Sequence, residues 1–189
     1  MEYEVKFKIE KCGPVAAKLK RLGAEDLGRR KEIDIYMQSG EKAVRLRKLG
    51  SKGILTLKSL VCKKIRAKVR KETEVNFDNA DTLIEIFKRL GFSEIKRKEK
   101  IRHTFRLGKA LVLLDRLPFM GYFIELEAAS ESVLKSVSKK LGFDYNKASG
   151  ASYEDLFLAY YIKHARRFNN TKVKILPTFE SEREFTKSP

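Results

Sequence analysis

The chain has 189 residues, a length typical of one domain or at most two, and 42% of them are hydrophobic, which excludes a chain that is disordered throughout. Its 42 lysines and arginines outnumber its 25 aspartates and glutamates, and the resulting net charge of +17 predicts an anionic partner. No run of about 20 apolar residues is present, and the first residues are charged from Glu2 onward. We therefore expect a cytoplasmic protein with neither a membrane span nor a signal peptide.

Eight segments have the alternating pattern, the β-branched or aromatic content and the flanking turn residues that are typical of strands. In chain order these are 2–11, 28–37, 43–49, 53–60, 66–77, 93–106, 110–117 and 121–129. Glycine-containing turns at 50–53 and 108–109 join two pairs of them as hairpins. Because helical patterns separate few of these strands, the sequence predicts an antiparallel α+β protein.

Apolar residues at helical spacing predict four helices, over about 14–22, 83–90, 133–141 and 152–166. Gly23, Gly91 and Gly142 follow the first three, where a left-handed residue commonly ends a helix. An E-x-E tripeptide precedes each of these three helices, in strands 2–11, 66–77 and 121–129. This recurrence predicts a domain with internal pseudo-symmetry.

Charged residues gather on one face of the predicted strands, because side chains at i and i+2 of a strand project together. In the first strand, Glu2, Glu4, Lys6 and Lys8 lie opposite an apolar set that begins with Tyr3. We therefore expect helices to pack on the apolar face. Further pairs and triplets share a face in the same way: Arg45 with Arg47, Glu72 with Glu74, Lys98 with Lys100 and Arg102, and Glu125 with Glu127.

This alternation fits two architectures. In an open sheet, the polar face meets water, as antiparallel sheets commonly do. In a barrel with helices packed outside, the polar face lines a tunnel, which requires a ligand because unpaired buried charge is costly. Carboxylates bind hard cations such as Mg²⁺, and arginine and lysine bind phosphate oxygens, so a metal-bound triphosphate would satisfy both sets of charges.

The segment Glu2-Tyr-Glu4-Val-Lys6 resembles the E-x-E-x-K signature of the CYTH superfamily, the triphosphate tunnel metalloenzymes. That superfamily includes class IV adenylyl cyclases, thiamine triphosphatases and inorganic or RNA triphosphatases. The resemblance covers about residues 1–162 and is strongest to archaeal members named as class IV adenylyl cyclases. Similar motifs follow in the same order, at Asp34 and Tyr36, Arg45 and Arg47, Lys58, Glu72 and Glu74, Lys100 and Arg102, Asp115, Gly121 to Glu127, and Ser152 and Tyr153.

The resemblance implies an α+β fold with an eight-stranded antiparallel closed β-barrel, helices packed outside, and a tunnel that binds a triphosphate with Mg²⁺ or Mn²⁺. It places this tunnel domain at residues 1–165 and leaves a basic and polar tail at 166–189, which we expect to be disordered or to dock on a partner. One departure is Phe119-Met120, which stands before Gly121 where many relatives have an acidic turn.

Candidate site residues follow from their chemical type together with the resemblance. The candidate metal ligands are Glu2, Glu4, Glu125 and Glu127, with Glu72, Glu74 and Asp115 as further choices. The candidate phosphate ligands are Lys6, Lys8, Arg45, Arg47, Lys58, Lys100 and Arg102. No general base is identified; Lys6 and a glutamate of the tunnel are both candidates. The alternative is that these charges pair with one another and perform no chemistry.

Three functions remain open on this evidence. The first is hydrolysis of an inorganic or organic triphosphate, and the second is an adenylyl cyclase that makes cyclic AMP from ATP at the same site. The third, less favoured, is a non-catalytic protein that binds polyphosphate or nucleic acid, in which case binding should depend strongly on salt. We expect a small-molecule triphosphate as partner and a monomer or a homodimer. Neither GxxxxGK[ST] nor GxGxxG is present, so these two glycine-rich phosphate loops are excluded.

Overall fold

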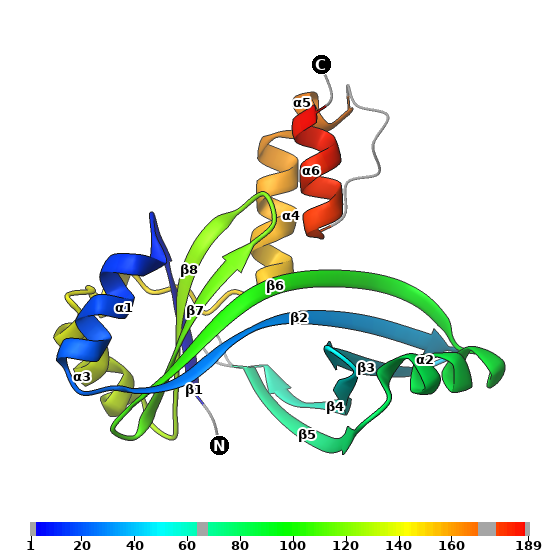
Figure 1. Cartoon of the computed structure of the whole chain (residues 1–189), viewed down its shortest axis with the longest axis horizontal. Helices are drawn as coiled ribbons and strands as arrows, with labels where there is room; N and C mark the ends of the chain where they lie inside the picture. Colours follow the sequence, from blue (N-terminus) through cyan, green and yellow to red (C-terminus); the bar gives the residue numbers. More distant parts are fainter. Residues whose placement is uncertain (1–2, 64–67, 170–176, 188–189) are drawn as a thin grey trace.

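The computed structural model describes residues 3–63, 68–169 and 177–187, whose strands form one antiparallel sheet. The predicted α+β class and the eight antiparallel strands are confirmed. The strands are joined in the order β1-β8-β7-β6-β2-β3-β4-β5, and the long β2 and β6 connect the two parts of a strongly bent sheet (Figure 1). They are β1 (Tyr3–Ile9), β2 (Glu25–Ser39), β3 (Lys42–Leu49), β4 (Lys52–Lys63), β5 (Lys68–Phe77), β6 (Ser93–Leu107), β7 (Ala110–Leu117) and β8 (Gly121–Ala128).

Closure of the sheet into a barrel is not confirmed. β1 and β5 are the two ends of the strand order, and no pairing joins them within the described residues. The outer edge of β1 is bonded instead to the segment that follows the third helix. The Lys6 N–H donates to the Ser149 carbonyl, and the Ser149 N–H donates to the Lys6 carbonyl, both at 2.8 Å. This segment satisfies edge groups of β1 that a partner strand would otherwise satisfy.

Helices α1 (Cys12–Arg21) and α3 (Glu131–Leu141) cover the apolar face of β1, β8 and β7, as expected (Figure 1). The core between them includes Phe7, Leu19, Ile124 and Leu134, which are all buried. Gly142 ends α3 in the left-handed conformation with φ 83°, which confirms its predicted role. The charged face of these strands therefore points away from α1 and α3.

A second core lies under α2 (Ala80–Arg89), at the other end of the sheet. Ile35, Met37 and Leu46 are buried there, on β2 and β3, and Phe87 of α2 packs against them. The Asn79 side chain accepts a hydrogen bond from the Thr82 N–H and caps the start of the helix. These two cores fix the two parts of the sheet from its apolar side.

The fourth helix, α4 (Tyr153–Lys163), lies against the other face of the sheet, which corrects the expectation that all helices pack outside. Its residues Tyr153 and Phe157 pack against Met120 and Phe123. Phe123 projects from the same face of β8 as Glu125, so the charged face carries an apolar patch at this end. Burial of that patch holds α4 there, and Ser152 starts the helix with the predicted capping box.

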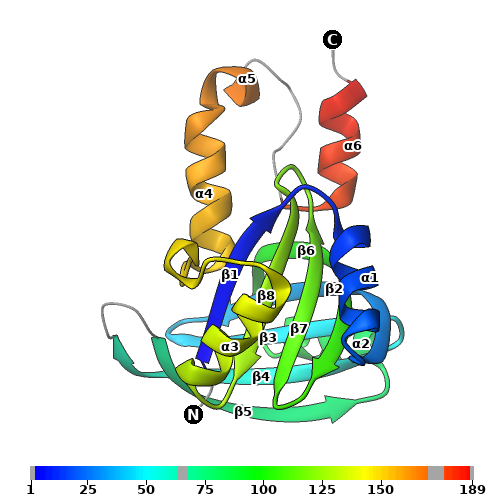
Figure 2. The same ribbon diagram turned by 90° about the vertical axis from the view of Figure 1, so that its left-hand side faces the viewer.

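The chain continues through α5 (Ala165–Asn169) to α6 (Phe179–Lys187); the remaining short helix is η1 (Tyr145–Lys147). α4 and α6 flank the turn between β7 and β8 (Figure 2), and the Phe119 ring of that turn contacts Phe157, Phe168 and Phe185. Glu182 of α6 accepts hydrogen bonds from the Phe119 N–H and from Arg116, both at 2.8 Å.

The described part of the expected tail therefore includes a helix, α6, which contacts the turn between β7 and β8. A domain boundary at residue 165 stays a prediction. Among the helices that the structure describes, none combines the length and the apolar character that crossing a bilayer requires.

Candidate active site

The polar face of the sheet holds a dense set of buried charges, contributed by β1, β2, β3, β6, β7 and β8. Each of these residues is at most 9% exposed, although residues of this kind are almost never buried unless they are paired. The set comprises Lys6, Glu32, Asp34, Arg45, Lys100, Arg102, Asp115 and Glu125. The strand alternation that the sequence predicts brings these residues together, and their pairing divides them into connected groups.

Arg102 of β6 is the centre of the first group. Its guanidinium donates to the two carboxylate oxygens of Asp115 at 2.8 and 2.6 Å and also contacts Glu125. Tyr153 of α4 donates its hydroxyl to Asp115 at 2.9 Å. Burial raises the pKa of Tyr153 well above its ordinary value, and the negative charge of Asp115 adds to this effect. Tyr153 is therefore a neutral hydrogen-bond donor that connects α4 to the site.

Lys6 of β1 extends this group to a set of carboxylates. Its ammonium lies 3.0 Å from Glu125 and 3.1 Å from Glu4. Glu4, Glu125 and Glu127 each offer a carboxylate oxygen, and these three atoms lie within 4.8 Å of one another; we call these residues the carboxylate cluster. Burial alone would raise the pKa of Glu125, but Arg102 and Lys6 lower it. Glu125 is therefore ionised, as a metal ligand must be.

Glu32 of β2 organises the second group. Its carboxylate lies 3.3 Å from the Lys100 ammonium and 3.5 Å from the Arg47 guanidinium. Arg47 also donates two hydrogen bonds to Asp34, at 2.7 and 3.0 Å. Burial alone would raise the pKa of Glu32, but the positive charges of Lys100 and Arg47 outweigh it and lower this pKa to about 2. Glu32 is thus ionised and keeps two phosphate-binding candidates in place.

Replacing Glu32 by glutamine is expected to lower the free energy of unfolding at pH 7 by about 3 kcal/mol, because Lys100 would lose this buried counter-charge and Arg47 would keep only its pairing with Asp34 of the two described above. Since the pKa of Glu32 is about 2 in the folded chain against an ordinary 4.5, this contribution is complete above pH 4.5 and disappears as the pH falls toward 2. Urea denaturation at pH 7 and pH 3 measures both effects. Glu85→Gln, at an exposed pair with Arg89, is the control, and an equal loss in both variants would contradict the assignment.

Glu154 connects α4 to the charged face of the sheet. Its carboxylate accepts hydrogen bonds from Lys98 at 2.6 Å and from the Tyr36 hydroxyl at 3.2 Å, and it lies 3.6 Å from the Lys96 ammonium. Burial alone would raise the pKa of Glu154, but the charge of Lys98 lowers it. Another group of contacts joins β3, β4 and β5, where Arg45 donates hydrogen bonds to Thr56 and to Glu74.

Most of the predicted site residues that the structure describes are in these groups: Glu4, Glu74, Glu125 and Asp115 among the carboxylates, and Lys6, Arg45, Arg47, Lys100 and Arg102 among the cations, with Glu127 in the carboxylate cluster. Lys8 lies toward the end of β1, with its ammonium 5.9 Å from the centre of the Phe123 ring. Glu2 and the side chains of Lys58 and Glu72 lie outside the described residues.

Five residues of the site were not among the predicted ligands: Glu32, Asp34, Lys98, Tyr153 and Glu154. The alternating pattern of β2 could have identified Glu32 as a site residue. Glu32 shares a face of the strand with Asp34, which the resemblance had singled out. Lys98 likewise shares a face with Lys100 and Arg102. No sequence signal placed α4 on this face, so Tyr153 and Glu154 could not be assigned.

The chain is similar to a known protein family and to several archaeal proteins. The CYTH domain family model matches residues 1–144. A protein of Methanocaldococcus jannaschii, whose name proposes an adenylate cyclase, is 29% identical over 140 residues, which are 70% of this chain and 79% of that protein. Two solved structures cover 82% of this chain and 99% of their own: a Pyrococcus horikoshii protein with 27% identity and a TM-score of 0.68, and a Pyrococcus furiosus protein with 25% identity and a TM-score of 0.67.

Proposed function

This chain belongs to the CYTH domain family, and from that premise we propose that it is a divalent-metal-dependent triphosphatase, which hydrolyses the terminal phosphate of a small-molecule triphosphate. The observation that carries the proposal is the composition of the buried polar face. Cations suited to phosphate and carboxylates suited to a metal ion occupy adjacent positions there, and Lys6 and Arg102 both contact Glu125. A metal-bound triphosphate complements both kinds of charge.

The carboxylate cluster fits a hard divalent cation. Its members Glu4, Glu125 and Glu127 offer only oxygen donors, which Mg²⁺ and Mn²⁺ prefer, and the donors lie close enough to serve one ion. When bound, such an ion polarises phosphate oxygens and lowers the pKa of a water molecule. Asp115 is instead bound to Arg102 and Tyr153, so we propose that it positions these two side chains and does not bind the metal.

The cations of the face would bind the phosphate oxygens. Lys6 and Arg102 contact Glu125 of the carboxylate cluster, and Lys6 and Lys100 lie over the Tyr153 ring, while Arg45 and Arg47 lie on β3. Lys6, Lys100, Arg102 and Arg47 are each held by a buried carboxylate, so ion pairs within the protein fix the positions of these cations. Preformed charges of this kind stabilise the developing negative charge of phosphoryl transfer without reorganisation.

Hydrolysis forms a bond between a water oxygen and the terminal phosphorus and breaks the bond from that phosphorus to the bridging oxygen. The bridging oxygen keeps the electron pair and leaves as part of a diphosphate, and the water molecule releases a proton. We assign no residue as the base; Lys6 is assigned to phosphate binding, because its ammonium lies between two carboxylates. The expectations of a monomer or homodimer and of a cytoplasmic location stay predictions.

The name of the Methanocaldococcus jannaschii relative favours adenylyl cyclase as the second candidate. That reaction would use the same charged face but would direct the ribose 3′-hydroxyl at the α-phosphorus and release diphosphate. The two reactions differ in their products and not in the residues that bind the phosphates. They are therefore separated by product analysis.

We expect turnover of at least one member of a panel of inorganic triphosphate, ATP and thiamine triphosphate, with Mg²⁺ or Mn²⁺ present. A chelator should abolish this turnover, and excess metal should restore it, because the metal ion would supply the charge that polarises the phosphate oxygens and lowers the pKa of the attacking water. Chromatographic separation of phosphate, diphosphate, ADP and cyclic AMP identifies the reaction. Turnover that persists in chelator would contradict metal dependence, and tight, salt-dependent binding without turnover would favour the binding protein instead.

A further inference from the structure

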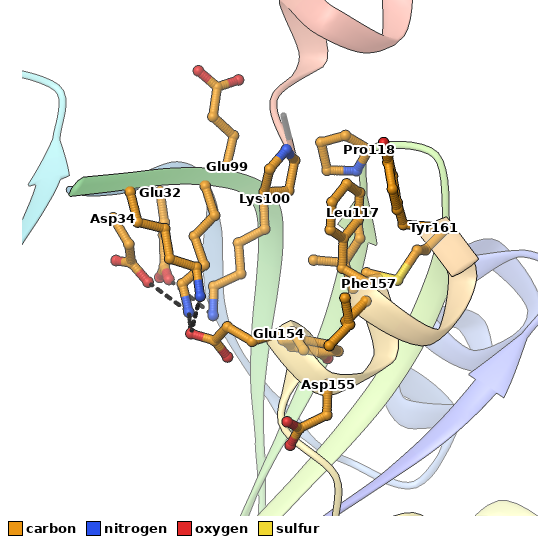
Figure 3. Close-up of a pocket in the computed structure, with 16 residues that line it drawn as sticks. Glu32, Asp34, Glu99, Lys100, Leu117, Pro118, Glu154, Asp155, Phe157 and Tyr161 are labelled. Atoms are coloured by element: carbon orange, nitrogen blue, oxygen red, sulfur yellow. Dashed lines mark hydrogen bonds and ion pairs between the residues drawn. The ribbon is translucent and has the colours of Figure 1, made fainter. Parts of the chain in front are cut away.

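Two cavities border α4. The larger, of about 470 Å³, lies between β6, the turn that joins β7 to β8, and α4 (Figure 3). Carboxylates and lysines of the charged face line it together, among them Glu32, Asp34 and Lys100, so this cavity belongs to the site already described. The smaller cavity, of about 280 Å³, lies between β1, the segment that follows α3, and α4. We call it the β1 cavity.

The β1 cavity is lined by positive charge. Of the described residues that line it, Lys6, Lys8 and Lys147 are basic, and none is acidic. The ammonium of Lys6 is already paired with Glu4 and Glu125. In the described parts of the chain, neither Lys8 nor Lys147 lies within ion-pair distance of a carboxylate. These residues therefore give the cavity two ammonium groups and no counter-charge for them.

The fold brings these lysines together by pairing the edge of β1 with the segment that follows α3 (Figure 2). Lys6 and Ser149 form an antiparallel bridge, with the reciprocal backbone hydrogen bonds of 2.8 Å described above. Because the bridge is antiparallel, Lys8 and Lys147 lie on the same side of it, each two residues away. Like charges that face each other across neighbouring segments repel, so an anion between the two lysines would stabilise this arrangement.

The other groups that line the β1 cavity suit a small oxyanion. Ser149 accepts a hydrogen bond from the Ala151 N–H at 3.2 Å, so its hydroxyl proton can be donated to a ligand. An ammonium group is a compact donor of several hydrogen bonds, and the oxygens of phosphate accept such bonds from several directions. Phe123 and Leu156 form an apolar wall, which strengthens the attraction between an anion and the lysines. A volume of about 280 Å³ is below the usual range for organic ligands of drug size, so the cavity suits a small ion.

We infer that the β1 cavity binds a free inorganic oxyanion of the phosphate type, held by Lys8, Lys147 and Ser149. This second anion site borders the proposed triphosphate site at Lys6 but uses different cations. It gives Lys8, which lies toward the end of β1, a role apart from the triphosphate. The inference does not rest on the proposed function, because oxyanion binding here requires neither a metal ion nor turnover.

Equilibrium dialysis with radioactive inorganic phosphate tests this inference, because the titration counts the phosphate sites and gives the affinity of each. Lys147→Gln removes one positive charge from the β1 cavity. Lys109→Gln is the matched control, since Lys109 is also an exposed lysine but lies in the turn between β6 and β7 and does not line the cavity. Both variants have the same net charge. The full chain is used without divalent metal and at one chloride concentration, so the general attraction of the chain for anions is equal in the two variants.

We expect one phosphate site to lose at least about fivefold in affinity in Lys147→Gln, because a charge-assisted hydrogen bond to the ion is lost. In Lys109→Gln, every phosphate site should keep its affinity within about twofold of the unsubstituted chain, because no contact with the ion changes. If the unsubstituted chain binds no phosphate, or if the two variants bind it equally, the inference is wrong. Neither result affects the proposed function, which turnover of a triphosphate by the unsubstituted chain tests separately.

Discussion

Replacing Glu4 by glutamine is expected to reduce metal-dependent turnover by about 100-fold or more while the chain stays folded. Glu4 belongs to the carboxylate cluster, and glutamine removes the negative charge that a divalent cation requires but keeps the size of the side chain. Its carboxylate is 52% exposed and pairs with Lys6 at 3.1 Å, so loss of the pair should cost less than about 1 kcal/mol of stability. Turnover at several metal concentrations and urea denaturation measure the two effects.

Glu25→Gln is the matched control for this experiment. Glu25 is a strand glutamate that is 64% exposed and pairs with Arg106, away from the carboxylate cluster. We expect its turnover and its metal dependence to equal those of the unsubstituted chain. If Glu4→Gln retained full turnover at low metal concentration, Glu4 would be excluded as a metal ligand.

Replacing Arg102 by glutamine is expected to lower both the stability of the chain and its turnover. Arg102 neutralises Asp115 and Glu125, whose side chains are 0% and 6% exposed. Without it, Asp115 would lose this buried cation, and Glu125 would keep its contact with Lys6 but lose the one with Arg102. We expect a loss of about 3 to 5 kcal/mol in the free energy of unfolding, together with loss of turnover. Urea denaturation measures the first change.

A double-substitution cycle separates this ion pair from a general defect in packing. Asp115→Asn removes one of the two carboxylates, so the double variant with Arg102→Gln should lose less stability than the sum of the single losses. Arg106→Gln, on the same strand but 57% exposed, should cost little. Additive losses for Arg102 and Asp115 would contradict the coupling.

The composition of the charged face could be predicted from the sequence because it depends on local alternation. Lys6, Arg47 and Arg102 were assigned to one face from the two-residue repeat of their strands, and each pairs with a buried carboxylate there. Glu32 was missed although the same repeat contains it. It lies in a segment rich in charged residues, where one glutamate among several lysines and arginines does not stand out.

The position of α4 and the closure of the sheet could not be predicted, because both depend on contacts between distant segments. The capping residues Ser152 and Asp155 fix where α4 begins, but its place on the charged face depends on Met120 and Phe123, about 30 residues earlier. Closure requires β1 to pair with β5, yet the edge of β1 is bonded to Ser149. Sequence periodicity specifies the face of a strand and not its neighbour.

The position of bond cleavage tests the central claim most directly. ATP would be incubated with the chain and Mg²⁺ in water enriched in ¹⁸O, and the products would be separated and weighed by mass spectrometry. We predict ADP without label and inorganic phosphate that carries one ¹⁸O atom, because water attacks the terminal phosphorus next to the carboxylate cluster. Cyclic AMP with unlabelled diphosphate would contradict hydrolysis and would establish the cyclase reaction at the same site.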